Sequence, residues 1–402
     1  NVTSSGNQTY TGAVTLSGGD RGLTAPFVDF QSTLAGGTND LTVTGNATFG
    51  AEASGLVDLT VTGTSSVAAN VTGTGAQAFD GRVTLTGDAT FTGTTGTFSG
   101  GLEGGSNALG LDFSAVVTID GSDTFSNIST LTSTGPTRLN GTINTTGLQR
   151  YASAVTLLGG TDLTASNVTF GSTVSGGASP LTVTGDLFVD GAVTNLGGLD
   201  VTGNTDLGAD ITTVSGGQTY NGTVLLTGGG TRTLTGSGQT VGFLGNLDGG
   251  SQALHVAANL NLQADLGNLS SFQGQSTSTL NGNVTTSAGQ QFVGDVTLGG
   301  DAVLTSSSND VVRIDSTVTG GGNDLTIAGQ ALLKAAVSGV ADLSVSHAAT
   351  IEDTVSTTNN QTYSGPVTIA VTGGQFTGNV VAFGSTVDGG TRNFNVIGNA
   401  SI

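Results

Sequence analysis

The chain has 402 residues, a formal net charge of −20 and 69 glycines, but no cysteine, methionine or tryptophan. The lack of cysteine excludes disulfide scaffolds, thiolate metal sites and cysteine nucleophiles. The acidic balance argues against nucleic acid as a partner and against insertion into or binding to an anionic membrane. Because only 9% of residues are charged and Gly, Thr, Ser and Val are abundant, the composition favours β-structure over helix or disorder.

Along the chain, the first recurrent element is a glutamine followed at alternating positions by an aromatic residue, a valine and a leucine or isoleucine. Its copies recur at an almost constant interval of roughly 70 residues, and alternate copies are most alike, which indicates a doublet of two variant repeats. The six copies begin at Gln8-Tyr10, Gln77-Phe79, Gln149-Tyr151, Gln218-Tyr220, Gln290-Phe292 and Gln361-Tyr363.

A pair of glycines precedes an apolar segment in each of the six copies and supports the same period. The first glycines of these pairs are Gly36, Gly104, Gly176, Gly249, Gly320 and Gly389. We therefore divide the chain into approximate repeats over 1–69, 70–141, 142–209, 210–282, 283–353 and 354–402. The last repeat is incomplete, so we expect the array to continue beyond Ile402.

The local period within each repeat is two, which is the period of a strand with one buried face. Leu41 and Val43 fall on one face of such a strand, and the segments end at Gly or Asn-Gly, where chains turn. Leucines recur at one fixed spacing at positions 41 and 59, 181 and 199, and 325 and 343, and this spacing fits a single coil. We predict one continuous all-β solenoid over 1–402, with roughly 18 to 24 residues in each coil.

Other architectures fit the pattern less well. A membrane barrel needs longer strands and aromatic girdles, and a string of small β-sandwich domains would have linkers between its members. The segment Ala331–Val337 tolerates a helix, but its short length favours a strand. We also predict that the six motif glutamines and aromatic residues face the interior at equivalent corners, since Gln8 shares the parity of Tyr10.

The repeats resemble those of large bacterial surface exoproteins, namely filamentous-haemagglutinin-like adhesins and autotransporter passengers. The resemblance covers the chain and implies a secreted right-handed parallel β-helix that acts as an adhesin, a stalk or a matrix fibre. The residues that carry it are Tyr10, Thr33, Gly36, Gly37, Asn39, Asp40 and Leu41 in the first repeat and Asn323, Asp324 and Leu325 in the fifth.

Residues with catalytic or metal-binding chemistry are few and dispersed. His255 and His347 belong to no ligand motif, so we interpret both as structural. The glutamates are Glu52, Glu103 and Glu352, and the aspartates are dispersed and often stand beside glycine, as turn residues do. Asn39-Asp40 and Asn323-Asp324 echo calcium-binding repeats but lack their tandem spacing, which favours a corner role. We therefore assign no catalytic, cofactor-binding or metal site and expect no cofactor.

The leading hypothesis is a non-catalytic extracellular structural repeat that forms the shaft of a fibre, matrix filament or adhesin. Eight basic residues and no Cys or Met leave few targets for trypsin-like proteases and sulfur oxidation, which suits a cell-surface location. Expected partners are further copies of the chain, joined end to end or laterally, and surface glycans. A polysaccharide-processing β-helix enzyme and a carbohydrate- or ice-binding module are the alternatives.

Overall fold

A computed structural model describes residues 1–119 and 125–402, and these residues form strands and turns without a helix. The chain divides into two compact units, Asn1–Gly203 (unit 1) and Asn204–Ile402 (unit 2). Unit 1 holds strands β1 (Val2–Thr3) to β22 (Gly198–Val201), and unit 2 holds β23 (Thr205–Leu207) to β49 (Phe394–Ser401). In the part of the chain that is described, no helix could cross a membrane.

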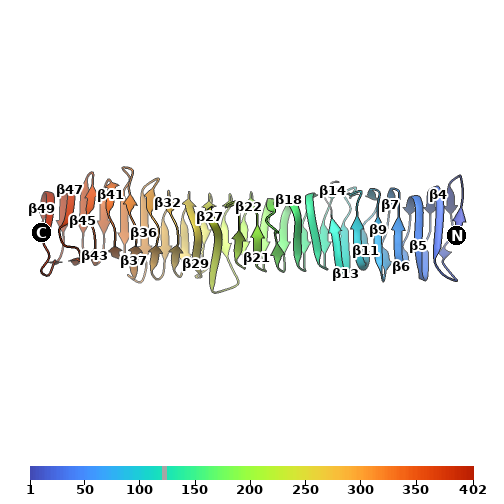
Figure 1. Ribbon diagram of the computed structural model, residues 1–402, viewed down its shortest axis with the longest axis horizontal. Coiled ribbons are helices and arrows are strands. Elements are labelled where there is room, and N and C mark those ends of the chain that lie inside the picture. Colours follow the sequence, from blue (N-terminus) through green and yellow to red (C-terminus); the bar gives the residue numbers. More distant parts are fainter. Residues whose placement is uncertain (120–124) are drawn as a thin grey trace. The chain divides into compact units, whose positions relative to one another are not determined.

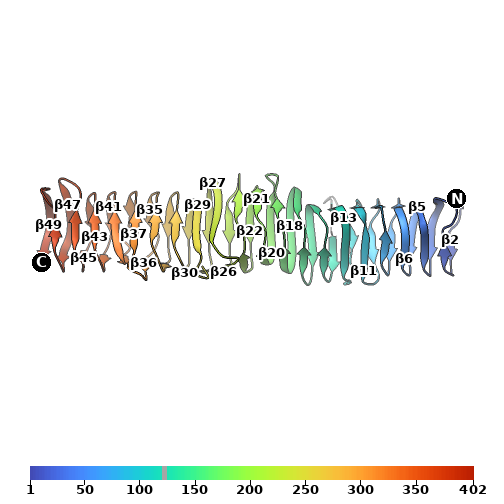
Figure 2. The ribbon, with the colours of Figure 1, turned by 90° about the horizontal axis from the view of Figure 1, so that it is seen from below.

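Each unit is a parallel β-solenoid, as the sequence predicts. In unit 1, β2 (Gln8–Tyr10) pairs in parallel with β4 (Arg21–Phe30), which pairs with β5 (Leu34–Phe49), which pairs with β6 (Ala53–Val61). The strands of successive turns therefore lie side by side within each unit (Figures 1 and 2). Main-chain hydrogen bonds between turns satisfy the polar backbone, and alternate side chains enter the core.

The coil length that the leucine spacing predicts is confirmed at all three places. The register pairs Leu41 with Leu59, Leu181 with Leu199 and Leu325 with Leu343. Other turns are longer, as the pairing of Gln290 with Val312 shows. Since the ladder continues through both lengths, the extra residues lie in the corners.

In unit 1 the strands form three columns, which we call faces A, B and C. Their inward residues show that the sequence repeat and the turn do not coincide. Gln8 is followed on face A by Val28, Ala47 and, three turns on, Ser65, whereas Gln77 lies on face C. One sequence repeat thus spans three turns and part of a fourth. The first members of the columns are Gln8, Val28, Ala47 and Ser65 on face A, Val14, Leu34, Ala53 and Val71 on face B, and Leu23, Val43, Val61 and Phe79 on face C.

The glutamine motif consequently moves to a new face in each repeat. Gln149 lies on face B, because Tyr151 continues the column Phe91, Leu111, Ser133. The three motifs of unit 2 also occupy three different columns, in which Gln218 precedes Val241, Gln290 precedes Val312 and Gln361 precedes Val381. The corners are therefore locally equivalent but rotated around the axis of each unit.

All six motif glutamines are buried, as predicted, and so are five of the six aromatic residues; Tyr10, near the N-terminus, is half-buried. Nε2 of Gln149 donates to the carbonyl oxygens of Ile143 in the same turn and Thr164 in the next, at 3.0 Å each. The hydroxyl of Tyr151 donates to Oε1 of Gln149 at 3.1 Å. Burial raises the pKa of Tyr151 well above its usual range, so this hydroxyl stays a donor.

The two glycines of a pair are needed for different structural reasons. A Cβ on the first glycine would meet the backbone of the next turn, at 2.6 Å from the carbonyl oxygen of Gly55 for Gly36 and 2.3 Å from Cα of Val340 for Gly320. The second glycine has a positive φ, 57° at Gly37. The first glycine allows close stacking, and the second turns the corner.

The helix-tolerant segment contains the end of one strand, a corner and the start of the next strand, and no helix. Residues up to Leu333 belong to β40 (Gln330–Leu333), and Val337 begins β41 (Val337–Val340). Ala331 and Leu333 are buried, and Leu332 points outward, so the local pattern is that of a strand. The parallel partners of β40 on both sides decide its conformation over the helix propensity of Ala and Leu.

Candidate functional site

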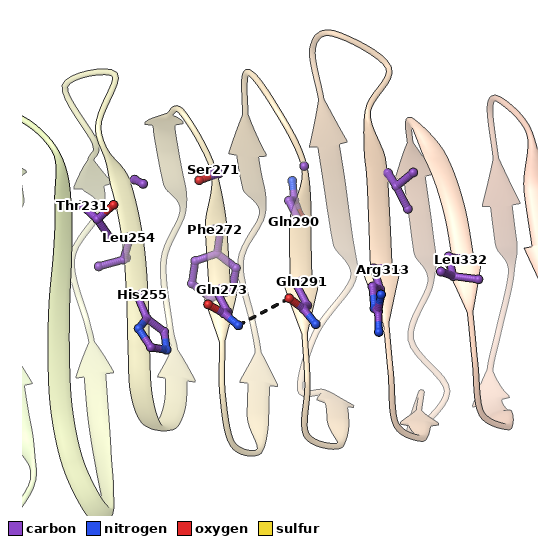
Figure 3. Close-up of a pocket in the computed structure, with 13 residues that line it drawn as sticks. Thr231, Leu254, His255, Ser271, Phe272, Gln273, Gln290, Gln291, Arg313 and Leu332 are labelled. Atoms are coloured by element: carbon purple, nitrogen blue, oxygen red, sulfur yellow. Dashed lines mark hydrogen bonds between the residues drawn. The ribbon is translucent and has the colours of Figure 1, made fainter.

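An outward-facing groove in unit 2 is the candidate site. It crosses β29 (Ala253–Leu262), β31 (Phe272–Gly274), β34 (Gln290–Phe292), β37 (Val311–Ile314) and β40. The register places His255 beside Gln273, Gln273 beside Gln291, and Gln291 beside Arg313, each one turn apart. Figure 3 shows these side chains in a row on neighbouring strands.

A row of small residues forms a trough next to this polar row. Ala253, Ser271 and Gly289 lie two positions before His255, Gln273 and Gln291 in their turns, and Thr231 and Val311 lie at its two ends. The groove has a volume of about 540 Å³. Side chains two positions apart in a strand share a face. In each of these turns a small residue and a long one therefore both point outward, and together they form two parallel rows. We call this feature, with both rows, the unit 2 groove.

Asp315 organises the basic end of the unit 2 groove. Its carboxylate accepts hydrogen bonds of 2.7 Å from Nε2 of Gln291 and from Nε of Arg313, and Nζ of Lys334 lies 3.5 Å away. Burial by itself raises the pKa of Asp315, but the hydrogen bonds from Gln291 and Arg313 and the charges of Arg313 and Lys334 outweigh it, so the pKa lies below its usual value. Asp315 is therefore an anion that fixes the guanidinium of Arg313.

Hydrogen bonds link part of the polar row. Nε2 of Gln273 donates to Oε1 of Gln291 at 3.4 Å, a long contact (Figure 3). Nε2 of His255 is shielded from solvent and has no hydrogen-bond partner among the described residues. The groove thus combines amide, imidazole and guanidinium groups, which suit hydrogen bonding to a polar ligand.

Comparison with protein-family models, with curated proteins and with solved structures found no match to this chain.

The structure places the two histidines in different surroundings. His255 lines the unit 2 groove, whereas Nδ1 of His347 lies 2.8 Å from Oγ of Ser346 at the corner after β42 (Leu343–Val345). His347 is therefore held by its neighbour in the sequence. The interpretation of His255 as a structural residue stays a prediction, because its ring lies on the outer surface of a groove.

The aspartates at the corners form ladders from turn to turn. Oδ1 of Asp20 accepts the N–H of Asp40 at 3.0 Å, and Oδ1 of Asp40 accepts the N–H of Asp58 at 3.1 Å. In unit 2, Asp324 accepts the N–H of Asp342 at 2.9 Å. Each carboxylate satisfies a donor that the strand ladder leaves unpaired at the corner.

The asparagines of the two calcium-like segments also act at corners. Nδ2 of Asn39 donates to the carbonyl oxygen of Gly36 at 2.8 Å, and Nδ2 of Asn323 donates to that of Gly320 at 3.0 Å. Among the described residues, no three His, Asp or Glu side chains are grouped so that they could hold a metal ion.

None of the three glutamates lines the unit 2 groove, but Glu352 follows Ile351, the register partner of Leu333, and so lies beside Lys334. Glu103 is in β12 (Leu102–Glu103), where it forms a 2.7 Å ion pair with Arg82. Hydrogen bonds from Asn127 and Ser126 and the charge of Arg82 outweigh partial burial and lower the pKa of Glu103. Glu52 and Glu352 lie in corners, after β5 and after β43 (Ala349–Ile351).

Sequence reasoning missed Gln273, Gln291, Arg313 and Asp315. A usable signal was present, because strand parity alone puts Gln291 outward between the inward pair Gln290 and Phe292. Which outward residues become neighbours depends on the lengths of the turns between them. These lengths follow from the register, in which the turn from Gln291 to Arg313 is longer than the turn from Gln273 to Gln291.

Proposed function

We propose that this chain is a non-catalytic structural segment, the shaft of an extracellular bacterial fibre, matrix filament or adhesin. The observation that carries the proposal is the direction in which the recurrent residues point. In the described copies of the motif, the repeated glutamine and aromatic residue lie inside the solenoid. What the repeat preserves is therefore its own core.

The outward residues of the same motif differ in chemistry. The position between the glutamine and the aromatic residue faces outward and is Thr9, Ala78, Arg150, Thr219, Gln291 or Thr362 in the six copies. An array of identical binding sites would repeat its surface residues. A shaft needs only a repeated core, because each turn is stabilised by its neighbours.

The internal contacts fit a load-bearing role. Aromatic rings stack in register between turns, with centroids 5.3 Å apart for Tyr10 and Phe30 and 5.6 Å apart for Phe30 and Phe49. The motif glutamines join consecutive turns through side-chain hydrogen bonds, as Gln361 does with Val355 and Thr377 at 3.1 and 2.8 Å. Cooperative contacts of this kind resist the opening of single turns.

Immunogold electron microscopy on cells that produce the chain tests this function. Antibodies raised against the purified chain are applied to intact cells and, in parallel, to permeabilised cells. The proposal expects label on filaments or a surface layer of intact cells. Label that appears only after permeabilisation would overturn the extracellular assignment, and label dispersed in the medium without filaments would overturn the shaft.

A further inference from the structure

We propose that the unit 2 groove binds an extended acidic polysaccharide, and that the guanidinium of Arg313 holds a carboxylate of that ligand. This goes beyond the role of a shaft, because it assigns a specific ligand class to one face of the chain. The inference rests on the form of the groove, on its local charge and on the groups that lie ready to donate hydrogen bonds.

The length of the groove fits a chain-like ligand. From β29 to β40 its lining crosses five strands that neighbour one another in the ladder about 4.8 Å apart, which gives about 19 Å between the outer two. Thr231 of β27 (Thr231–Phe243) extends the lining by one more strand. A short oligosaccharide spans such a distance, whereas a single sugar would cover only part of the row. The donors are spaced along the direction in which such a chain would lie.

The charges favour an acidic ligand at this place. Unit 2 contains four basic residues, and two of them, Arg313 and Lys334, flank Asp315 at the end of the groove. Arg232 is buried and donates to main-chain carbonyls of Leu207 and Thr227, so its guanidinium stabilises the fold. Among the residues that line the groove, Arg313 carries the one formal charge, in a chain of net charge −20.

The geometry of Arg313 leaves its outer edge available to a carboxylate. Nε is held by Asp315 at 2.7 Å, while the two terminal nitrogens have no acceptor among the described residues. A guanidinium with a fixed Nε presents its terminal N–H groups in one direction, which suits two parallel hydrogen bonds to a carboxylate. Asp315 thus acts as a positioning residue for Arg313.

The rest of the lining suits sugar rings. Gln273 offers an amide to ring hydroxyls, and the trough of Ala253, Ser271 and Gly289 offers a flat, weakly polar floor for the C–H face of a ring. Nε2 of His255, which has no partner among the described residues, could accept or donate one further hydrogen bond after a small rotation of the ring. A polar buried atom without a partner is costly, so pairing it favours binding.

Other extended polymers fit less well. A peptide that added a strand would need an unpaired sheet edge, but β31 and β34 are paired on both sides by parallel neighbours. A nucleic acid carries a phosphate on each nucleotide and would need a longer row of basic side chains. A uronic acid polymer matches a guanidinium that is followed along the row by neutral amide donors.

Isothermal titration calorimetry with tetragalacturonate tests the proposal, with the fully methyl-esterified tetramer as the neutral probe. The full chain is used at low ionic strength and again near 0.15 M salt, roughly the physiological value. We expect the wild-type chain to bind the acid, the affinity to fall with salt, and the ester to bind at least about tenfold more weakly. Arg313→Gln should lower the affinity for the acid about tenfold or more.

Two further variants separate the groove from general effects of charge and folding. Arg138→Gln removes an exposed arginine from a strand of unit 1 and should leave the affinity unchanged. Ser271→Leu fills the trough without a change of charge and should abolish binding while circular dichroism stays that of the wild type. The proposal is overturned if the wild type binds neither probe, if it binds both equally, or if Arg313→Gln binds as the wild type does.

Discussion

The hydroxyl of Tyr151 donates a 3.1 Å hydrogen bond to Oε1 of Gln149, inside a core where both side chains are fully buried. Tyr220 and Gln218 repeat the arrangement at 2.9 Å. In the two copies that carry phenylalanine, Phe79 and Phe292, the glutamine oxygen is buried without a partner among the described residues. The motif therefore occurs in a satisfied and an unsatisfied form within one chain.

Exchanging the two forms should change stability in opposite directions. Tyr151→Phe leaves Oε1 of Gln149 unpaired and should lower the free energy of unfolding by about 1–2 kcal/mol. Phe79→Tyr supplies the missing donor to Gln77 and should raise it by up to about 1 kcal/mol. Urea denaturation followed by circular dichroism measures both, and equal shifts of the same sign would contradict the hydrogen-bond explanation.

The first glycine of a pair that lies close against the next turn, as Gly320 does, should tolerate no side chain. A Cβ at Gly320 would lie 2.3 Å from the backbone of Val340, so Gly320→Ala should destabilise unit 2 by about 1–3 kcal/mol. Gly267→Ala is the matched control, because its Cβ would meet only one atom, at 3.9 Å. Thermal unfolding of the two variants compares them. A similar loss in both would show that close stacking is not the cause of the cost at Gly320.

The ion-pair cluster at Asp315 should make stability depend on pH at the acid end. The pKa of Asp315 is lower in the folded chain than in the unfolded chain, so its contribution is complete above the unfolded value of about 3.9 and is lost as the pH falls through the folded value. The stability gap between the wild type and Asp315→Asn should be largest near neutral pH and shrink below about pH 4. Denaturant midpoints measured across this range check the trend; a gap that grew on acidification would reverse the sign of the shift.

Removal of one whole turn should preserve the fold. Leu41 pairs with Leu59 and Thr42 with Thr60, so deletion of residues 42–59 joins Leu41 to Thr60 in the original register. We expect a folded, shorter chain whose midpoint of thermal unfolding differs little from that of the wild type. Deletion of residues 42–50 removes half a turn, breaks the register of face A and should expose apolar surface. Small-angle scattering and circular dichroism distinguish the outcomes.

The sequence itself determined the all-β class, the set of residues that face the core and the length of the shortest coil. These features follow from local physics: alternation sorts side chains such as Leu41 and Thr42 to opposite faces, and glycine pairs mark corners that need positive φ. The burial of Gln149 with Tyr151 followed from shared parity. None of these conclusions required knowledge of which turn lies beside which.

The tertiary structure alone decided which outward residues meet. His255, Gln273, Gln291 and Arg313 become neighbours because the ladder keeps its register through turns of unequal length, and Asp315 then reaches both Gln291 and Arg313. The length of a turn depends on how many residues its corners hold while the strands on either side stay paired. Local sequence patterns do not encode this number. For the same reason the glutamine motif lies on different faces in the first two repeats: one sequence repeat is not a whole number of turns.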